Sequence, residues 1–114
     1  MNQLLVKLKD AECDVEGALA RFLDDEDLYV QFYSELLDDE AFTNLGNALE
    51  EGRLYDAFEF AHTLKGIIGN MGLTPMFELV CDIVEPLRIN TDDGVKEKYQ
   101  ELLKLREKFS EFIA

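Results

Sequence analysis

The side chain with the clearest chemical potential is His62, because it is the only histidine among the 114 residues. A neutral imidazole is a nucleophile that is available near neutral pH. Lys65, Gly66 and Gly69 follow it at offsets of three, four and seven residues, which places all four residues on one side of a helix. If the protein performs histidine chemistry, His62 must carry it.

A helix over residues 53–71 is predicted to hold this segment. Its apolar stripe consists of Leu54, Ala57, Ala61, Leu64, Ile68 and Met71. At about 100° per residue, His62 projects roughly 135° from the centre of the stripe, so we expect it to face solvent. Each glycine inside a helix costs about 1 kcal/mol relative to alanine, so Gly66 and Gly69 need a reason. Bare backbone would let a partner approach the imidazole, where Lys65 could meet a bound anion. Alternatively, the glycines allow a neighbouring helix to pack closely.

Residues 61–73, AHTLKGIIGNMGL, closely resemble the signature of histidine-containing phosphotransfer (HPt) domains, the intermediate carriers of bacterial multistep phosphorelays. The family pattern is a histidine, Leu-Lys-Gly, a small residue, an asparagine and a glycine. These fall here on His62, residues 64–66, Gly69, Asn70 and Gly72. A weaker downstream element, Cys followed by an apolar-Glu pair, is matched by Cys81 and residues 84–85. The resemblance covers at least residues 50–88.

The resemblance implies a role for each matched residue. His62 would be the phosphoacceptor, and Lys65 would stabilise the charge of the phosphoryl group. Gly66 would leave room for a partner receiver domain, while Asn70 and Gly72 would shape the end of the helix. Our candidate partner-binding residues on this side are Tyr55, Glu59, Gly66, Ile67 and Gly69.

For Tyr55 and Ile67, more than one interpretation of the side chain stays open. Tyr55 could supply an apolar rim contact, or it could be a surface tyrosine without a role. Ile67 departs from the family pattern, because it is bulkier than the small residues often found after Leu-Lys-Gly. It could pack on a flank of the helix or enlarge an apolar contact surface.

The implied function is that of a histidine phosphocarrier in a two-component phosphorelay. His62 would accept a phosphoryl group from a receiver-domain aspartate and pass it to a response regulator. We expect a transfer intermediate and not an enzyme, because the chain is too short to add a kinase ATP-binding domain. It should need no cofactor or metal of its own, since Mg²⁺ is expected on the receiver domain. Two alternatives are a non-catalytic helical bundle that docks receiver domains and an unrelated helical adaptor with an accidental match.

Composition narrows the classes of partner. With 11 basic and 25 acidic residues, the formal net charge is −14, which argues against nucleic acid and anionic membranes as partners. No secretory signal or 18-residue apolar span is evident, so a cytoplasmic protein is expected. The oligomeric state stays open at this level, with a monomer as the default expectation. Cys13 and Cys81 are too few for a disulfide scaffold and are predicted to be reduced thiols, although a bridge between them stays open at this level.

Helical periodicity accounts for almost the entire chain, and no segment alternates as a strand should. A short N-terminal helix is predicted after Asp14. The acidic tetrapeptide LDDE occurs at 23–26 and at 37–40, and each copy precedes a further helical pattern. These patterns form either two helices, the second of which ends at Gly52, or one bent helix over about 26–51. Thr74 is predicted to be the N-cap of a later helix with Pro75 at its first position, and Pro86 should kink or end this helix. The last helix is predicted to follow residues 90–93. The short connections predict an all-α fold, an antiparallel up-down four-helix bundle with a short additional N-terminal helix, in one domain over 1–114.

Overall fold

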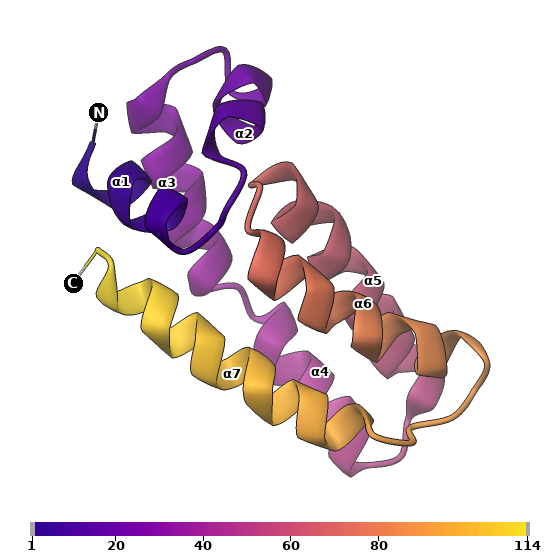
Figure 1. The fold of residues 1–114 in the computed structure, drawn as a ribbon. Helices are drawn as coiled ribbons and strands as arrows, with labels where there is room; N and C mark the ends of the chain where they lie inside the picture. Colours follow the sequence, from indigo (N-terminus) through magenta and orange to yellow (C-terminus); the bar gives the residue numbers. More distant parts are fainter. Residues whose placement is uncertain (1, 114) are drawn as a thin grey trace.

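The computed structural model describes residues 2–113, which contain seven helices and no strand and measure 43 × 24 × 21 Å. In chain order the helices are α1 (Gln3–Asp10), α2 (Val15–Arg21), α3 (Glu26–Leu37), α4 (Ala41–Glu50), α5 (Leu54–Asn70), α6 (Thr74–Arg88) and α7 (Val95–Glu111) (Figure 1). The all-α prediction is confirmed. The predicted number of helices, four long ones and one short one, is too low.

One extra helix lies at the N-terminus, where the sequence predicted only α2. Leu4, Leu5 and Leu8 of α1 are all buried, so this helix contributes one apolar face to the core. Its first turn is capped by Asn2, whose side chain accepts a 2.8 Å hydrogen bond from the Leu4 amide. The predicted cap of α2 is confirmed in the same way, since Asp14 accepts a bond from the Gly17 amide at 3.1 Å.

The second extra helix results from a break at residues 38–40, which separates α3 from α4. Of the two alternatives for this segment, two separate helices are therefore confirmed, and one bent helix over 26–51 is wrong. The Asp39 side chain accepts a 2.8 Å hydrogen bond from the Ala41 amide and so starts a new helix. The carbonyl of Leu37 at the end of α3 accepts a 2.6 Å bond from Arg106 Nε of α7. Both ends of the break are thus satisfied by side chains.

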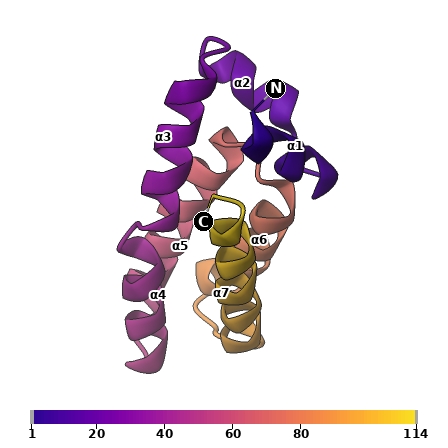
Figure 2. The same cartoon turned by 90° about the vertical axis from the view of Figure 1, so that its left-hand side faces the viewer.

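Consecutive helices pack against one another from α4 to α7, and α7 also contacts α3 and α4. Figure 2 shows α3 and α4 following one another along one side of the molecule. The other predicted boundaries shift little. Thr74 is the first residue of α6 and not its N-cap, and α6 ends at Arg88, two residues after Pro86. Within residues 2–113, no helix combines the length and apolarity needed to cross a membrane.

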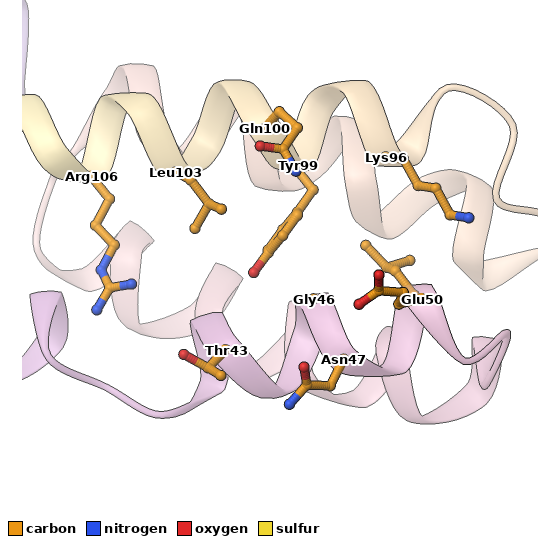
Figure 3. A pocket seen from close by; sticks show the side chains of 10 residues that line it. Thr43, Gly46, Asn47, Glu50, Lys96, Tyr99, Gln100, Leu103 and Arg106 are labelled. Carbon is orange, nitrogen blue, oxygen red and sulfur yellow. The ribbon is translucent and has the colours of Figure 1, made fainter.

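Tyr99 joins α7 to α4 (Figure 3). Its hydroxyl donates a 2.7 Å hydrogen bond to the Phe42 carbonyl, and its ring lies against Gly46, where a Cβ atom would overlap the phenol. Beside this contact lies an open groove of about 460 Å³ with Thr43, Asn47, Lys96 and Gln100 among its lining residues. Gly46 therefore has a packing role that fixes the spacing of α4 and α7.

Candidate functional site

Helix α5 exposes His62 to solvent, as its periodicity predicted. The buried face of the helix consists of Ala57, Ala61, Leu64 and Ile68, each with no accessible surface. His62 lies on the other side, with Gly66 one turn further along and also exposed. The sequence thus dictates the exposure of the imidazole, because burying the apolar stripe leaves His62 no other orientation.

The imidazole stacks on Phe58, a neighbour that was not among the predicted site residues. The rings of Phe58 and His62 have centroids 5.6 Å apart and planes inclined by 23°. The guanidinium of Arg88, near the end of α6, lies over the same Phe58 ring with its Cζ 5.3 Å from the centroid. Arg88 Nε is also 3.5 Å from Oε2 of Glu85. A chain of contacts therefore links His62 of α5 to two charged residues of α6.

A signal for Phe58 was present in the sequence, because it precedes His62 by four residues and so lies on the same face of the helix. The residues predicted on this face were instead Tyr55 and Glu59, which precede the histidine by seven and three residues. Arg88 could not be found in this way, since its proximity depends on how α6 packs against α5. The weaker match at residues 84–85 did place this part of α6 within the family resemblance.

Lys65 lies one turn beyond His62 and is half-buried. No hydrogen bond or ion pair within residues 2–113 engages its ammonium group. A lysine at this offset can place its charge beside an anion held on the imidazole, since positions i and i+3 are neighbours on a helix surface.

The two glycines beside His62 have different surroundings. A Cβ atom added to Gly66 would meet nothing within 4 Å, so this position is open. A Cβ atom added to Gly69 would lie 3.1 Å from Cε1 of Phe77 in α6. Each of the two interpretations therefore applies to one glycine. Gly66 leaves clearance next to the imidazole, whereas Gly69 allows α5 and α6 to pack closely.

The remaining candidates lie on different parts of the α5 surface. Tyr55 is 74% exposed and Glu59 is exposed, both on the N-terminal side of His62. Ile67 is half-buried and packs against the core, so it does sit on a flank. It also lines a cleft of about 450 Å³ to which Phe22 and Phe32 contribute. Ile67 thus both packs on a flank and borders an apolar surface.

The end of α5 is held by backbone geometry. Gly72 is buried with φ +71°, a left-handed conformation that favours glycine, and an added Cβ would overlap the Asp14 carbonyl. Its own carbonyl accepts a 2.8 Å hydrogen bond from the Asp14 amide. Gly72 is required here both by its conformation and by the close approach of the chain before α2.

Cys13 and Cys81 are both free thiols. Cys13 is buried, and this burial raises the pKa of its thiol to about 11. Among the described residues there is no group of three or more His, Cys, Asp or Glu side chains that could hold a metal ion.

Comparison with known families gives one match. The family model of the Hpt domain matches residues 27–107, from the first turn of α3 into α7. The match includes the whole of α5 and α6 and therefore all residues of the chain of contacts around His62. No match was found among curated proteins or among solved structures.

Proposed function

The chain belongs to the Hpt domain family, and on that basis we propose that it is a histidine phosphocarrier in a two-component phosphorelay. His62 accepts a phosphoryl group from the aspartate of a receiver domain and later passes it to a response regulator. The observation that carries the proposal is an exposed imidazole with open backbone at Gly66 and an unengaged Lys65 one turn away. In this role the protein is a cytoplasmic, monomeric intermediate of a bacterial relay and not a kinase.

The proposed transfer balances between the two proteins. The lone pair of one ring nitrogen of His62 attacks the phosphorus atom of the aspartyl phosphate. A nitrogen–phosphorus bond forms as the oxygen–phosphorus bond breaks, and that electron pair leaves with the aspartate carboxylate. The second ring nitrogen keeps its proton. Transfer to the next aspartate is the reverse reaction on another receiver domain.

Phosphoryl transfer depends mainly on in-line positioning and on neutralisation of charge. We propose that Lys65 supplies the charge from this chain, as a mobile ammonium group next to the phosphoryl oxygens. The receiver domain is expected to bring Mg²⁺. The chain itself then needs to offer only the nucleophile, the cation and an unobstructed approach.

We propose Gly66 as the glycine that provides this approach, because the space beside it is empty. Tyr55, Glu59 and Ile67 are proposed contacts for the receiver domain around the rim of the site. Gly69 is better explained by its contact with Phe77 and is not proposed to touch the partner.

The architecture that presents the site is proposed to be one domain over 1–114. In it, α4 to α7 form the antiparallel up-down four-helix bundle. The packing of each of these helices against the next, with α7 returning to α4, supports this arrangement. Helices α1 to α3 would then extend the bundle at the end where α5 finishes and α6 begins (Figure 1).

The test is intact-mass measurement after incubation with a phosphorylated receiver domain and Mg²⁺. We expect a single phosphoryl adduct that is labile in acid and stable in base, because it is a phosphoramidate. The His62→Gln variant should fold and bind the receiver domain but gain no mass. The Lys65→Gln variant should gain it more slowly.

Two outcomes would contradict the carrier function. If the receiver domain binds with equal affinity to the wild type and to His62→Gln but no adduct forms, the protein is a docking module. If no receiver domain binds, the family membership does not translate into participation in a phosphorelay.

A further inference from the structure

We propose that Arg88 is a positioning residue for His62 and acts through the ring of Phe58. The inference rests on the proposed function, since it concerns the orientation of the proposed phosphoacceptor. Its basis is the pair of ring contacts described above, in which Phe58 meets both the imidazole of His62 and the guanidinium of Arg88. Neither the exposure of His62 nor the charge of Arg88 by itself requires these contacts with Phe58.

An exposed histidine on a helix would otherwise sample several rotamers, which point its ring nitrogens in different directions. Stacking on an aromatic ring one turn earlier restricts that freedom, because side chains of a helix lean toward its N-terminus. The inclination of 23° shows that the two ring planes are close to parallel, as in a stacked pair. Nucleophilic transfer gains from such restriction, since it depends on the fraction of time spent near the attacking geometry.

Phe58 is itself held from two sides. It is half-buried and packs against the core, which fixes the ring on its inner side. On α6 the Arg88 guanidinium covers the ring, and Glu85 Oε2 lies 3.5 Å from Nε of that arginine. Cation–π contacts with arginine are favourable and directional. The ring on which His62 rests is therefore restrained by a residue of the neighbouring helix.

The single histidine makes the orientation directly measurable. In a proton NMR spectrum of the folded protein, the imidazole carbon-bound protons belong to His62 alone. We expect them to be shifted upfield by the Phe58 ring current, and to move toward random-coil positions in Phe58→Leu. Arg88→Gln should produce part of the same movement. Arg53→Gln is the matched control, because Arg53 pairs with Glu51 and Asp56, and the cation–π contacts found within residues 2–113 involve Arg88 and Arg106 instead.

The kinetic test uses phosphoramidate, a small phosphodonor, so that receiver binding does not enter the rate. Phosphorylation of His62 should slow roughly three- to tenfold in Phe58→Leu, and by a smaller factor in Arg88→Gln. If Arg88 acts through Phe58, the double variant should be no slower than Phe58→Leu alone. Arg53→Gln should react at the wild-type rate.

Two results would overturn the inference while leaving the carrier function intact. One is an Arg88→Gln spectrum in which the His62 ring protons do not move. The other is a double variant whose loss equals the product of the single losses, which would mean that Arg88 acts independently of Phe58. A wild-type protein that gains no phosphoryl group from either donor instead removes the proposed function, and the positioning role falls with it.

Discussion

Arg21 Nε donates a 2.9 Å hydrogen bond to the carbonyl oxygen of Asn70, the last residue of α5. Its Nη2 atom donates a second bond, of 3.1 Å, to the Gly69 carbonyl. The last carbonyls of a helix have no partner within the helix and carry the negative end of its dipole, so a guanidinium is well suited to cap them. The helix that presents His62 is thus closed by a residue of α2.

A buried hydroxyl strengthens the same end of the helix. Tyr29 of α3 has no accessible surface, and its hydroxyl donates a 2.7 Å hydrogen bond to the Met71 carbonyl. Arg21 lies before the segment that the Hpt family model matches, and Tyr29 lies at its start. Residues of α2 and α3 therefore hold the end of the helix that presents His62.

Replacing Arg21 by glutamine should lower the free energy of unfolding by about 1 kcal/mol, because two hydrogen bonds to the end of α5 are lost at an exposed position. The midpoint of urea unfolding, followed by circular dichroism, measures this change. Lys104→Gln removes an exposed cation for which no hydrogen bond or ion pair is found within residues 2–113, and it should leave the midpoint unchanged. Equal midpoints for the two variants would show that the cap contributes nothing.

The two glycines of α5 should respond differently to alanine. Gly66→Ala should raise the free energy of unfolding by up to about 1 kcal/mol, because the new methyl group meets open space and alanine favours the helix. Gly69→Ala should gain less or lose stability, because its methyl group must displace Phe77. Thermal unfolding of the two variants compares them directly.

Phosphotransfer by the same two variants tests whether each glycine leaves clearance for the receiver domain or allows α6 to pack closely. With a phosphorylated receiver domain, Gly66→Ala should accept the phosphoryl group more slowly, whereas phosphoramidate should phosphorylate it at the wild-type rate. In Gly69→Ala, the phosphorylation rate relative to the wild type should be the same with both donors. A Gly66→Ala protein that is unimpaired with the receiver domain would argue against close approach at this position.

Much of the site could be predicted from sequence because it lies on one helix. The offsets from His62 to Lys65 and Gly66 fix their relative directions, and the apolar stripe fixes which side faces solvent. The sequence alone offers no reason to assign different roles to Gly66 and Gly69, yet their surroundings differ. Both lie on the same side of α5, but only Gly69 is met by Phe77, and this depends on the angle at which α6 crosses it.

The break between α3 and α4 shows a similar limit. Helical periodicity continues through residues 38–40, so pattern alone allows one long helix. The structure ends α3 at Leu37, where Arg106 supplies a hydrogen bond from a residue 69 positions later in the chain. Helix α1 was missed because three leucines in a short, polar segment are a weak local signal, and their burial is decided by the helices around them.

Gly46→Ala should be destabilising by about 1–3 kcal/mol, because the new methyl group would overlap the phenol of Tyr99. The effect should be specific to this contact. In a Tyr99→Leu background, the further change Gly46→Ala should cost much less, and unfolding of the four proteins of this cycle measures the difference. Additive losses would mean that the α4–α7 spacing does not depend on the phenol.

Alkaline pH should weaken the fold, beginning with Cys13. Burial raises the pKa of this thiol from 9.0 to about 11, so between these values the unfolded chain loses a proton that the folded chain keeps. The free energy of unfolding must then fall as pH rises from 9 toward 11. Burial also raises the pKa values of Tyr29 and Tyr33 above 10.0, which adds to the decline beyond pH 10.

Urea unfolding at pH 7, 9, 9.5 and 10 under reducing conditions separates these contributions. The wild type should begin to lose stability near pH 9. Cys13→Ala should start from a lower value, since it removes a buried side chain, but should stay level until the tyrosines of the unfolded chain ionise near pH 10. Parallel curves for the two proteins between pH 9 and 10 would show that the buried thiol is not the group that titrates first.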